Sequence, residues 1–366
     1  MASSSSTSIV PDTMRAWHYS ARGSPDTVLT LSATLPAPSS ATLPEDHVVI
    51  KVAYTALNPL GYVIMGLLPP FLFKKPKIPE VDFSGEVVAR GSAVRSELAL
   101  GSHVFGLIKF EPGSSAGALA EYVAVPQDMV VPKPAKVRLE EAAGLGVTGC
   151  TAVELVKASG VGPGDAILIN GGSGGVGIMI IQIAKAAVGP EGKVVATCSA
   201  ANTALVTKLG ADEVVDYRAH DPLHEYLATT YGERPFDAII DNVGVQTLYD
   251  HSPDYLKEDG PFRCVGAMGA TSSLGRALAS FMSIGKNLYW PRILGGTPRQ
   301  YIFLSVMPGR ELLEQVKKRI DEGSLSTVVD SVWPMEDALK AYERIMSGRA
   351  KGKVVVHVLT EGEGEA

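Results

Sequence analysis

An apolar run that leads into a glycine-rich turn is the feature that most constrains this chain. Residues 166–170 read Ala-Ile-Leu-Ile-Asn, residues 171–177 read Gly-Gly-Ser-Gly-Gly-Val-Gly, and residues 178–187 contain neither proline nor glycine. This order predicts a buried strand, a tight turn and a helix, which is the local plan of a dinucleotide-binding fold. The helix N-terminus then offers N–H donors and partial positive charge to a pyrophosphate. A glycine loop that binds nothing is the alternative.

The glycines of this turn have separate expected roles. Without a Cβ at Gly172 and Gly174 the turn can be tight and its amides can approach the phosphates, while Gly177 lets the helix and the strand pack closely. The predicted cradle comprises Gly172, Ser173, Gly174, Gly175, Val176 and Gly177.

The composition is that of a soluble globular protein long enough for two domains. The chain has 366 residues, of which 46% are hydrophobic and 20% charged, and its 33 Lys and Arg against 39 Asp and Glu give a net charge of −6. No long basic run is present to attract a nucleic acid or an anionic membrane, and no apolar stretch is long enough to span a bilayer. We therefore expect a small molecule as the partner.

Three cysteines and the two ends of the chain bear on its location. Cys150, Cys198 and Cys264 lie far apart and are odd in number, which favours a reducing, cytoplasmic compartment over a disulfide framework. Residues 1–12 are Ser-rich and lack both Arg and a long apolar core, so we interpret them as a disordered leader rather than a secretory signal. The Gly- and Glu-rich residues 361–366 are expected to be a disordered tail.

The rhythm of the chain changes near residue 132. Residues 13–131 carry short β-rich runs between prolines and glycines, which predicts a mostly antiparallel, barrel-like domain. In residues 132–322 strands alternate with helices, as a parallel sheet requires. The expected strands of this second domain are 166–170, 193–197, 213–216, 236–241, 262–266 and 301–305.

The last part of the chain is expected to return to the first domain. After a helix at 310–321 the sequence is again β-like, and residues 352–358 form a predicted closing strand. Residues 323–360 would then complete the first domain and leave a cleft between the two domains for coenzyme and substrate.

Six motifs occur along the chain in an order that a known family shares. They are Asn58-Pro59; Pro79-Glu80-Val81-Asp82-Phe83-Ser84-Gly85; Gly117-Ala118-Leu119-Ala120-Glu121-Tyr122; Ala142-Ala143 through Thr151-Ala152; the glycine turn; and Leu209-Gly210-Ala211-Asp212-Glu213-Val214-Val215-Asp216-Tyr217. Together they resemble the medium-chain dehydrogenase/reductase superfamily, and most nearly its zinc-independent quinone oxidoreductase (zeta-crystallin-like) and enoyl reductase branch. The resemblance implies an α/β fold with a Rossmann-type doubly wound parallel sheet and a GroES-like, mostly β domain. Dimers are common in this family, so a homodimer is compatible with it.

The zinc ligands of the related alcohol dehydrogenases are absent. Those enzymes carry a Cys in the region of Asn58, a Gly-His-Glu near residues 81–83 and a second Cys near Leu145, and this chain has none of them. A catalytic zinc ion needs about three protein ligands. His220 and His224 share a helical spacing but have no further ligand nearby in sequence, which favours a solvated helix face. We therefore expect hydride chemistry without a metal.

The end of the second predicted strand bears on the choice of coenzyme. Residues 195–199 read Val-Ala-Thr-Cys-Ser, without the acid that would bind a ribose 2′-hydroxyl and repel a 2′-phosphate. This absence predicts NADPH, although the basic residue often found just after this strand is missing. The resemblance implies that Ser199, Asn202 and Tyr217 contact the phosphate or the adenosine. Alternatively, Ser199 caps the helix that begins near Asn202.

Three further segments are expected beside the coenzyme. Asn242 and Val243 follow the fourth predicted strand and Val265 lies at the end of the fifth, at the carboxyl edge where the nicotinamide is expected. Lys351 lies in a segment that resembles the closing motif of the family, in which a lysine can approach the coenzyme. An exposed basic turn is the alternative for Lys351.

The expected catalytic segment departs from the family pattern at two positions. Residues 55–62 resemble the segment that borders the nicotinamide, which usually contains Asn-Pro-Val-Asp, and here Gly61 replaces the Asp. Related trans-acting enoyl reductases of polyketide synthesis often have a Lys two residues later, where this chain has Val63. An ammonium group for the developing oxyanion is therefore missing.

Three polar side chains remain as catalytic candidates near this segment. We expect Asn58 to orient the coenzyme or the substrate, and Tyr62 or Tyr54 to donate a hydrogen bond to an enolate. Tyr62 packed with a hydrogen-bonded tip, and Asn58 as a turn residue, are the alternatives. The apolar residues of 65–73 and 279–294 are candidate walls for a hydrophobic substrate, with core packing or a dimer contact as the alternative.

The leading functional hypothesis is an NADPH-dependent, zinc-independent oxidoreductase that reduces quinones or the C=C bond of α,β-unsaturated carbonyl compounds, in secondary metabolism. Two other hypotheses keep the fold. One is a non-redox isomerase or cyclase acting on a biosynthetic intermediate, and the other is an NADPH-binding protein without enzymatic activity.

Overall fold

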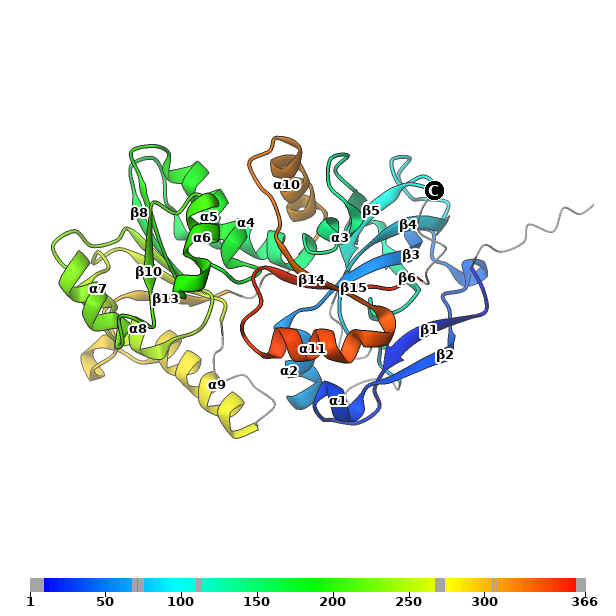
Figure 1. Cartoon of the computed structure of the whole chain (residues 1–366), viewed down its shortest axis with the longest axis horizontal. Helices are drawn as coiled ribbons and strands as arrows, with labels where there is room; N and C mark the ends of the chain where they lie inside the picture. The colour runs from blue at the N-terminus through cyan, green and yellow to red at the C-terminus, as the bar shows by residue number, and fades with distance from the viewer. Residues whose placement is uncertain are drawn as a thin grey trace, which may run out of the picture. The chain divides into compact units, whose positions relative to one another are not determined.

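The computed structural model describes residues 10–67, 71, 76–109, 114–266, 274–304, 306 and 308–359. The chain divides into two compact units (Figure 1). Unit 1 comprises Met1–Val147, Pro308–Lys317 and Val329–Ala366, and unit 2 comprises Thr148–Met307 and Lys318–Val328.

Unit 2 contains a six-stranded parallel sheet in the order β10-β9-β8-β11-β12-β13. In order along the chain the strands are β8 (Ala166–Asn170), β9 (Lys193–Cys198), β10 (Glu213–Asp216), β11 (Ala238–Asp241), β12 (Pro261–Cys264) and β13 (Gln300–Phe303). This order is that of the doubly wound dinucleotide-binding fold, and it confirms the predicted fold class. All six strands were predicted, with ends that differ by no more than two residues.

Helices follow most of these strands along the chain. They are α4 (Gly146–Ser159), α5 (Gly177–Val188), η4 (Ala200–Asn202), α6 (Thr203–Lys208), α7 (Leu223–Tyr231), α8 (Gln246–Asp250), η5 (Ser252–Asp254), α9 (Leu274–Tyr289) and η6 (Arg292–Leu294). The central strand β8 is apolar over consecutive residues, and Ile167, Leu168 and Ile169 are all fully buried, because both faces of a parallel sheet are covered. A glycine turn at the end of this strand is therefore held by a rigid, dry sheet.

Unit 1 is mostly antiparallel, as predicted. A hairpin pairs β1 (Thr13–His18) with β2 (Thr30–Pro36). A seven-stranded sheet contains β3 (His47–Ala56), β4 (Asp82–Arg90), β5 (His103–Leu107), β6 (Tyr122–Pro126), β7 (Val130–Pro132), β14 (Val329–Pro334) and β15 (Lys353–His357). Among the described residues this sheet follows an open path from β14 to β7, with β6 branching from β3, rather than a closed ring.

Short helices connect the strands of unit 1. They are α1 (Pro25–Val28), η1 (Ser40–Thr42), α2 (Pro59–Leu67), η3 (Gln127–Met129), α3 (Leu139–Ala142), η7 (Met335–Asp337) and α11 (Ala338–Met346). Pro59 starts α2, where a proline has no N–H to lose and its φ suits a helix. A further helix, α10 (Arg310–Asp321), matches the predicted range and passes from unit 1 into unit 2.

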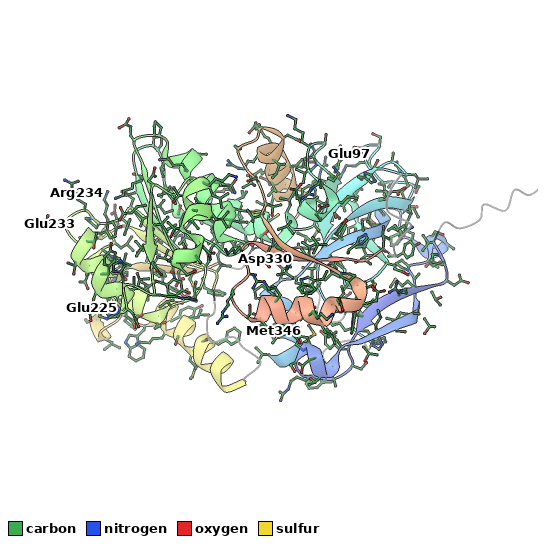
Figure 2. All side chains as sticks on the ribbon, viewed as in Figure 1. Glu97, Glu225, Glu233, Arg234, Asp330 and Met346 are labelled. Atoms are coloured by element: carbon green, nitrogen blue, oxygen red, sulfur yellow. The ribbon has the colours of Figure 1, made fainter. Side chains whose placement is uncertain are left out.

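The C-terminal strand returns to unit 1, as the sequence predicted. Strand β15 pairs antiparallel with β3, with Val355 opposite Ala56 and His357 opposite Tyr54. Figure 2 shows Asp330 on β14, close to α11. The Asp330 carboxylate accepts two hydrogen bonds from Arg344 and one from the backbone N–H of Lys351. This clamp fixes the turn that precedes β15.

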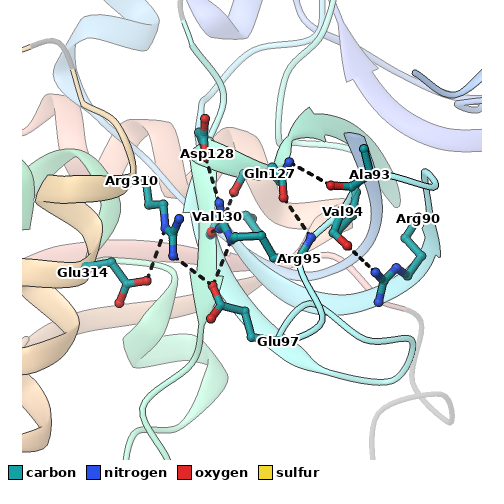
Figure 3. A network of polar contacts seen from close by, with 10 residues as sticks. All are labelled: Arg90, Ala93, Val94, Arg95, Glu97, Gln127, Asp128, Val130, Arg310 and Glu314. Atoms are coloured by element: carbon teal, nitrogen blue, oxygen red, sulfur yellow. Dashed lines mark hydrogen bonds and ion pairs between the residues drawn. The ribbon is translucent and has the colours of Figure 1, made fainter. Parts of the chain in front are cut away.

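The compact units differ from the predicted domain boundaries at three places, of which the shortest is residues 323–328, assigned to unit 2 instead of the first domain. Residues 132–147 belong to unit 1 rather than to the parallel-sheet unit, because α3 packs against β3 and β4. The first part of α10 also belongs to unit 1, where Arg310 pairs with Glu97 at 3.5 Å within the polar network of Figure 3. These contacts join segments far apart in the chain, which a change of sequence rhythm does not reveal.

The N-terminal segment is ordered earlier than predicted. Val10 is buried against Val49 and Val88, whereas Pro11 and Asp12 are exposed. Residues 1–9 and the predicted tail 361–366 lie outside the described residues. Among the helices of the described part of the chain, none combines the length and the apolar character needed to cross a bilayer.

Candidate active site and coenzyme cradle

The glycine turn of unit 2 is pinned to the neighbouring strand β9. The backbone N–H of Gly172 donates to the carbonyl of Thr197 at 2.8 Å, and the N–H of Gly171 donates to the Thr197 hydroxyl at 3.0 Å. The residue with a positive φ is Gly171, at +81°, rather than Gly172 or Gly174. A side chain is therefore disfavoured at Gly171 by the backbone itself.

The space around each glycine shows which of them the protein itself requires. A Cβ built on Gly177 would lie 2.2 Å from the carbonyl oxygen of Gly171, so helix and turn can pack only if this residue is glycine. A Cβ on Gly172 would be a tight 3.1 Å from Ala196 and Ile181. At Gly174, in contrast, the nearest atom is 3.6 Å away. The protein therefore leaves room for at least a methyl group over Gly174.

Asp241, at the end of β11, organises the adjacent loop. Its carboxylate accepts hydrogen bonds from the backbone N–H groups of Val243, Gly244 and Val245 and from the amide of Asn170 at 2.8 Å. Burial raises the pKa of this carboxyl above its ordinary value, while these donors favour the charged form. Asp241 was not among the predicted site residues.

The predicted nicotinamide-side residues lie at this carboxyl edge. The Asn242 amide donates to the Asn170 carbonyl at 3.0 Å, and the N–H of Val265 donates to the Asp241 carbonyl at 3.2 Å. The Val243 side chain lies against Gly171, since a Cβ added to Gly171 would be 2.8 Å from it. Asn242, Val243 and Val265 are thus beside the glycine turn, and their contact with a nicotinamide remains a prediction.

A second polar group lies at the ends of β9 and β10. Asn202 donates to the Ser173 hydroxyl at 2.9 Å, which joins a predicted adenosine contact to the glycine turn. Ser199 is the N-cap residue of η4 by position, but its side chain makes no capping hydrogen bond. The backbone N–H of Tyr217 donates to the Cys198 carbonyl at 3.3 Å, which places Tyr217 beside the end of β9.

Arg218 supplies the cation that seemed to be missing from this part of the sequence. Its guanidinium lies 5.6 Å from the centre of the Tyr217 ring, a cation–π geometry, and both side chains are exposed. The sequence pattern does not point to Arg218, because it follows β10 rather than β9. Only the parallel pairing of these strands brings it to the end of β9.

Two observations fit a dinucleotide at this edge of the sheet. One is the free space over Gly174. The other is a pair of buried acceptor atoms, Asn202 Oδ1 and Asn242 Oδ1, which have no hydrogen-bond partner among the described residues. Since buried polar atoms are almost always hydrogen-bonded, these two acceptors are available to a polar ligand near the turn.

In unit 1 a buried polar network surrounds Asp82. Its carboxylate accepts from the Asn58 amide at 3.0 Å and from the backbone N–H of Val147 at 2.8 Å, and it pairs with the Lys353 ammonium at 3.5 Å. Lys353 also donates to Asn58 Oδ1 at 2.8 Å and to the Leu57 carbonyl at 3.1 Å. Burial raises the pKa of Asp82, and Lys353 opposes that rise.

Glu80 forms a second buried acid beside this network. It accepts from the Tyr342 hydroxyl at 2.7 Å and from the backbone N–H of Asn58 at 3.0 Å. Burial raises the pKa of Glu80 to about 7, despite these hydrogen bonds and the nearby Lys353. The backbone of Glu80 has a φ of +65°, which is uncommon for a residue other than glycine.

The network decides what Asn58 does. Its amide hydrogens bond the Ala56 carbonyl and Asp82, its side-chain oxygen accepts from Lys353, and the residue is only 5% exposed. The Asn58 carbonyl accepts from the N–H of Gly61 at 3.0 Å, so the interpretation of Asn58 as a turn residue also holds. The Asn58 side chain thus anchors the segment within unit 1, and its role toward the coenzyme or the substrate stays a prediction.

The two tyrosine candidates occupy different surroundings. Tyr62, on α2, is half-buried, and its hydroxyl has no hydrogen-bond partner among the described residues. Burial and the nearby Glu80 raise its pKa, which keeps the phenol protonated as a donor. Tyr54 stacks on His357 with ring centres 4.7 Å apart, and burial and Glu140 raise its pKa. The structure does not place Tyr54 with Tyr62.

Of the closing-motif lysines, the buried one is Lys353 rather than the predicted Lys351. Lys351 is exposed and its backbone N–H is held by Asp330. Asp82, Glu80 and Lys353 all lie in motifs that the sequence singles out, but Tyr342 lies in none. A lysine and two acids in otherwise apolar segments could have indicated this network, because a buried charge is costly unless it is paired.

Comparisons with known proteins match most of the chain. Residues 44–135 match the family model of the alcohol dehydrogenase GroES-like domain, and residues 209–356 match that of the zinc-binding dehydrogenases. The trans-enoyl reductase poxH of Penicillium oxalicum is 39% identical, over 95% of this chain and 99% of that protein. The chain belongs to the medium-chain dehydrogenase/reductase superfamily.

Other members of this superfamily support the same branch. The 2-methylene-furan-3-one reductase of Solanum lycopersicum is 32% identical, over 97% of this chain and 82% of that protein. The solved quinone oxidoreductase of Coxiella burnetii is 29% identical and superposes with a TM-score of 0.74, covering 95% of this chain and all of that one. This chain is therefore an oxidoreductase of the quinone oxidoreductase and enoyl reductase branch.

A zinc ion does not fit the residues that this superfamily member has. Among the described residues no group of three or more His, Cys, Asp or Glu side chains is arranged to hold a metal. At the positions that resemble the zinc-ligand segments, Asn58 and Asp82 instead bind the Lys353 ammonium. His220 stacks on Tyr226 and His224 on His251, so the two histidines have separate aromatic partners.

The expected apolar walls are only partly described. Met65 is buried, Phe71 is exposed, and residues 68–70 and 72–73 lie outside the described residues. On α9 and after it, Phe281, Met282, Tyr289 and Trp290 are more than half exposed. Core packing within this chain is therefore wrong for these four side chains, and a substrate wall or a contact with a second copy stays open.

Proposed function

We propose that this superfamily member is an NADPH-dependent, zinc-independent oxidoreductase that reduces the C=C bond of α,β-unsaturated carbonyl compounds, with quinones as a second substrate class. The observation that carries the proposal is the pair of features in the cradle, the space over Gly174 and the orphaned acceptors of Asn202 and Asn242. Full-length similarity to a trans-enoyl reductase and to a furanone reductase supports the substrate class.

The residues of unit 2 would hold the coenzyme in a fixed place. The glycine turn and the N-terminus of α5 receive the pyrophosphate, because the first N–H groups of a helix lack intrahelical partners. Asn242, Val243 and Val265 line the nicotinamide side. When bound, NADPH supplies the hydride for the substrate carbon.

The preference for NADPH over NADH is supported by the residues at the ends of β9 and β10. No carboxylate follows β9, and Ser199, Tyr217 and the Arg218 guanidinium lie beside it. A guanidinium binds phosphate oxygens with good geometry and keeps its charge. These residues therefore favour a 2′-phosphate.

In unit 1, Tyr62 is the proposed donor to the oxyanion that develops on the substrate carbonyl. Its hydroxyl has no partner among the described residues, and its raised pKa keeps the proton on it. The Asn58 network holds the segment from which Tyr62 projects. Phe281, Met282, Tyr289 and Trp290 are candidates for contact with a hydrophobic substrate, since more than half of each is exposed.

The direct test is turnover with a panel of enones and quinones. Oxidation of NADPH is followed at the nicotinamide absorbance band, and the product is examined for a saturated C=C bond. Turnover with at least one enone supports the proposal. Oxidation of NADPH by quinones alone would reassign the substrate class, and no oxidation with any substrate would contradict the proposal.

The coenzyme preference is tested with Arg218→Ala and Ser199→Ala. Loss of a charge-assisted hydrogen bond costs about 1.5–3 kcal/mol, so the Kd for NADPH should rise about 10- to 100-fold in each variant while that for NADH changes little. Lys208→Ala, in the last turn of α6, is the matched control. Equal effects on both coenzymes would contradict the phosphate role.

We also propose a reducing, cytoplasmic location and a homodimer. The three cysteines are buried, and none of them forms a disulfide within the described part of the chain, which supports the location. Light scattering of the purified chain measures the oligomeric state, and a monomeric mass would contradict the dimer.

A further inference from the structure

Glu80 and position 61 compete for one volume. A Cβ built on Gly61 would lie 2.2 Å from Glu80 Oε1 and 2.9 Å from the carboxyl carbon. No side chain can therefore be added at position 61 while Glu80 keeps its place. Position 61 is where the family pattern usually has an aspartate, so the carboxyl group of Glu80 reaches the same region from another segment.

The backbone of Glu80 is bent to aim its carboxyl group there. Its φ of +65° is strained for a side-chain-bearing residue, and such strain persists only where the surroundings enforce it. The carbonyl of Glu80 accepts from the N–H of Ala118 at 2.9 Å, and its carboxylate is held by Tyr342 and by the N–H of Asn58. Strained backbone of this kind is concentrated at functional sites.

The carboxyl group of Glu80 lies where it can hold a proton near neutral pH. The ionisable groups that act on it are Tyr342 of α11, Lys353 of β15, Asp82 of β4, Tyr62 of α2 and Tyr19 after β1. The Lys353 ammonium bonds Asp82, Asn58 and the Leu57 carbonyl, and it does not hydrogen-bond Glu80 within the described part of the chain. Desolvation therefore dominates, and it raises the pKa of Glu80.

We propose that Glu80 supplies the carboxyl group that the family pattern usually has at position 61. From its place just before β4, Glu80 positions residues 58–62, and with them the Tyr62 hydroxyl, for reduction of the substrate. Glu80 acts through the backbone of Asn58 and through its field on Tyr62, so it is a positioning residue. This inference rests on the proposed function, and the tests below separate the two.

The first test exchanges the two positions. Glu80→Gly removes the acid but suits the positive φ, so the chain should fold and kcat should fall about 10- to 100-fold, the scale of a misplaced reacting group. Gly61→Asp alone should lower the thermal midpoint and the activity, because of the 2.2 Å clash. The double variant should regain about tenfold or more of the kcat lost in Glu80→Gly. A double variant no more active than Glu80→Gly, or a Glu80→Gly variant with wild-type kcat, would overturn the proposal.

The second test uses pH. Wild-type kcat should show an inflexion near the pKa of Glu80, about 7, and Glu80→Gln should remove it while the Kd for NADPH stays the same. Gln can donate to the Tyr342 hydroxyl and accept from Asn58, so this variant should fold. Glu86→Gln, on strand β4 just after Glu80, is the matched control and should keep the wild-type profile. An inflexion that survives in Glu80→Gln would contradict the proposal.

Thermal unfolding of the four forms in the exchange separates this inference from the proposed function. If Glu80 occupies the space at position 61, Gly61→Asp should destabilise the chain much more in the presence of Glu80 than in its absence. The unfolding measurement requires no substrate. If wild type turns over no enone or quinone, the proposed function fails, and equal destabilisation in both backgrounds would sink the Glu80 pairing separately.

Discussion

The two units both contain buried carboxylates, but they surround them differently. In unit 2 the Asp241 carboxylate accepts from three backbone N–H groups of the loop that follows it and from the Asn170 amide on the neighbouring strand β8, all neutral donors. In unit 1 Asp82 and Glu80 depend on Lys353 and Tyr342, which arrive from the end of the chain. Unit 2 thus shapes a loop with its backbone, whereas unit 1 builds a polar centre from side chains.

This difference separates what each unit can tolerate. A site made by backbone groups is sensitive to an added Cβ at a close approach and less sensitive to the nature of other side chains. A site made by converging side chains is sensitive to the loss of any one partner, because the charge left behind is buried. The following substitutions test that distinction, from the largest expected effect to the smallest.

Replacing Lys353 by Met should have the largest effect. Lys353 is the cation paired with Asp82 among the described residues, and removal of one partner of a buried pair costs about 3–5 kcal/mol. Denaturant unfolding measures this loss. Lys351→Met, in the exposed turn, is the control and should cost less than about 1 kcal/mol. Similar losses in both variants would mean that the buried network contributes nothing special.

Replacing Gly177 by Ala should nearly match that effect in unit 2. The added methyl meets the Gly171 carbonyl oxygen at 2.2 Å, and overpacking of this kind costs about 3 kcal/mol. Gly174→Ala is the matched control, since its Cβ has ordinary space. It should leave the thermal midpoint unchanged yet weaken NADPH binding about tenfold or more, on the scale of 1.4 kcal/mol per decade. Unchanged NADPH affinity in Gly174→Ala would contradict the coenzyme cradle.

Glu80, in unit 1, should make the free energy of unfolding depend on pH. The pKa of Glu80 is about 7 in the folded chain against an ordinary 4.5, so between these values the folded state holds a proton that the unfolded state releases. Stability from this group is fully present below about pH 4.5 and is lost as the pH rises through 7. Relative to Glu80→Gln, wild type should lose about 2–3 kcal/mol between pH 4.5 and 8. A difference that is constant with pH would show that Glu80 does not titrate there.

Thr197→Val should have the smallest effect of the four. The hydroxyl accepts from the N–H of Gly171 and donates to Asn170, so its loss leaves buried polar groups unpaired at a cost of about 1–3 kcal/mol. Thr229→Val removes an exposed hydroxyl on α7 and should change stability by less than about 0.5 kcal/mol. Chemical denaturation of both variants decides whether the turn depends on this contact.

The features that the sequence predicted are those encoded locally. Residues 166–187 contain the strand, the turn and the helix in one stretch, and the parallel strands recur as short apolar runs. Asp82 lies in the 79–85 motif and Lys353 in the predicted closing strand. Their pairing, however, depends on β15, from the far end of the chain, lying beside β3. Tyr342 meets Glu80 only because α11 packs against α2.

The adenosine end shows the same limit on a smaller scale. No basic residue directly follows β9 in the sequence, because Arg218 comes after the next strand, β10. Parallel pairing of β9 with β10 brings the ends of these two strands together. Strand order, rather than distance along the chain, decides which side chains share the edge.

Single-turnover mixing of the protein with one equivalent of NADPH and an excess of an α,β-unsaturated carbonyl compound tests the central claim most directly. The account predicts that the nicotinamide absorbance is lost in step with formation of one equivalent of product saturated at the C=C bond. Conversion of the substrate with the NADPH absorbance unchanged would contradict it.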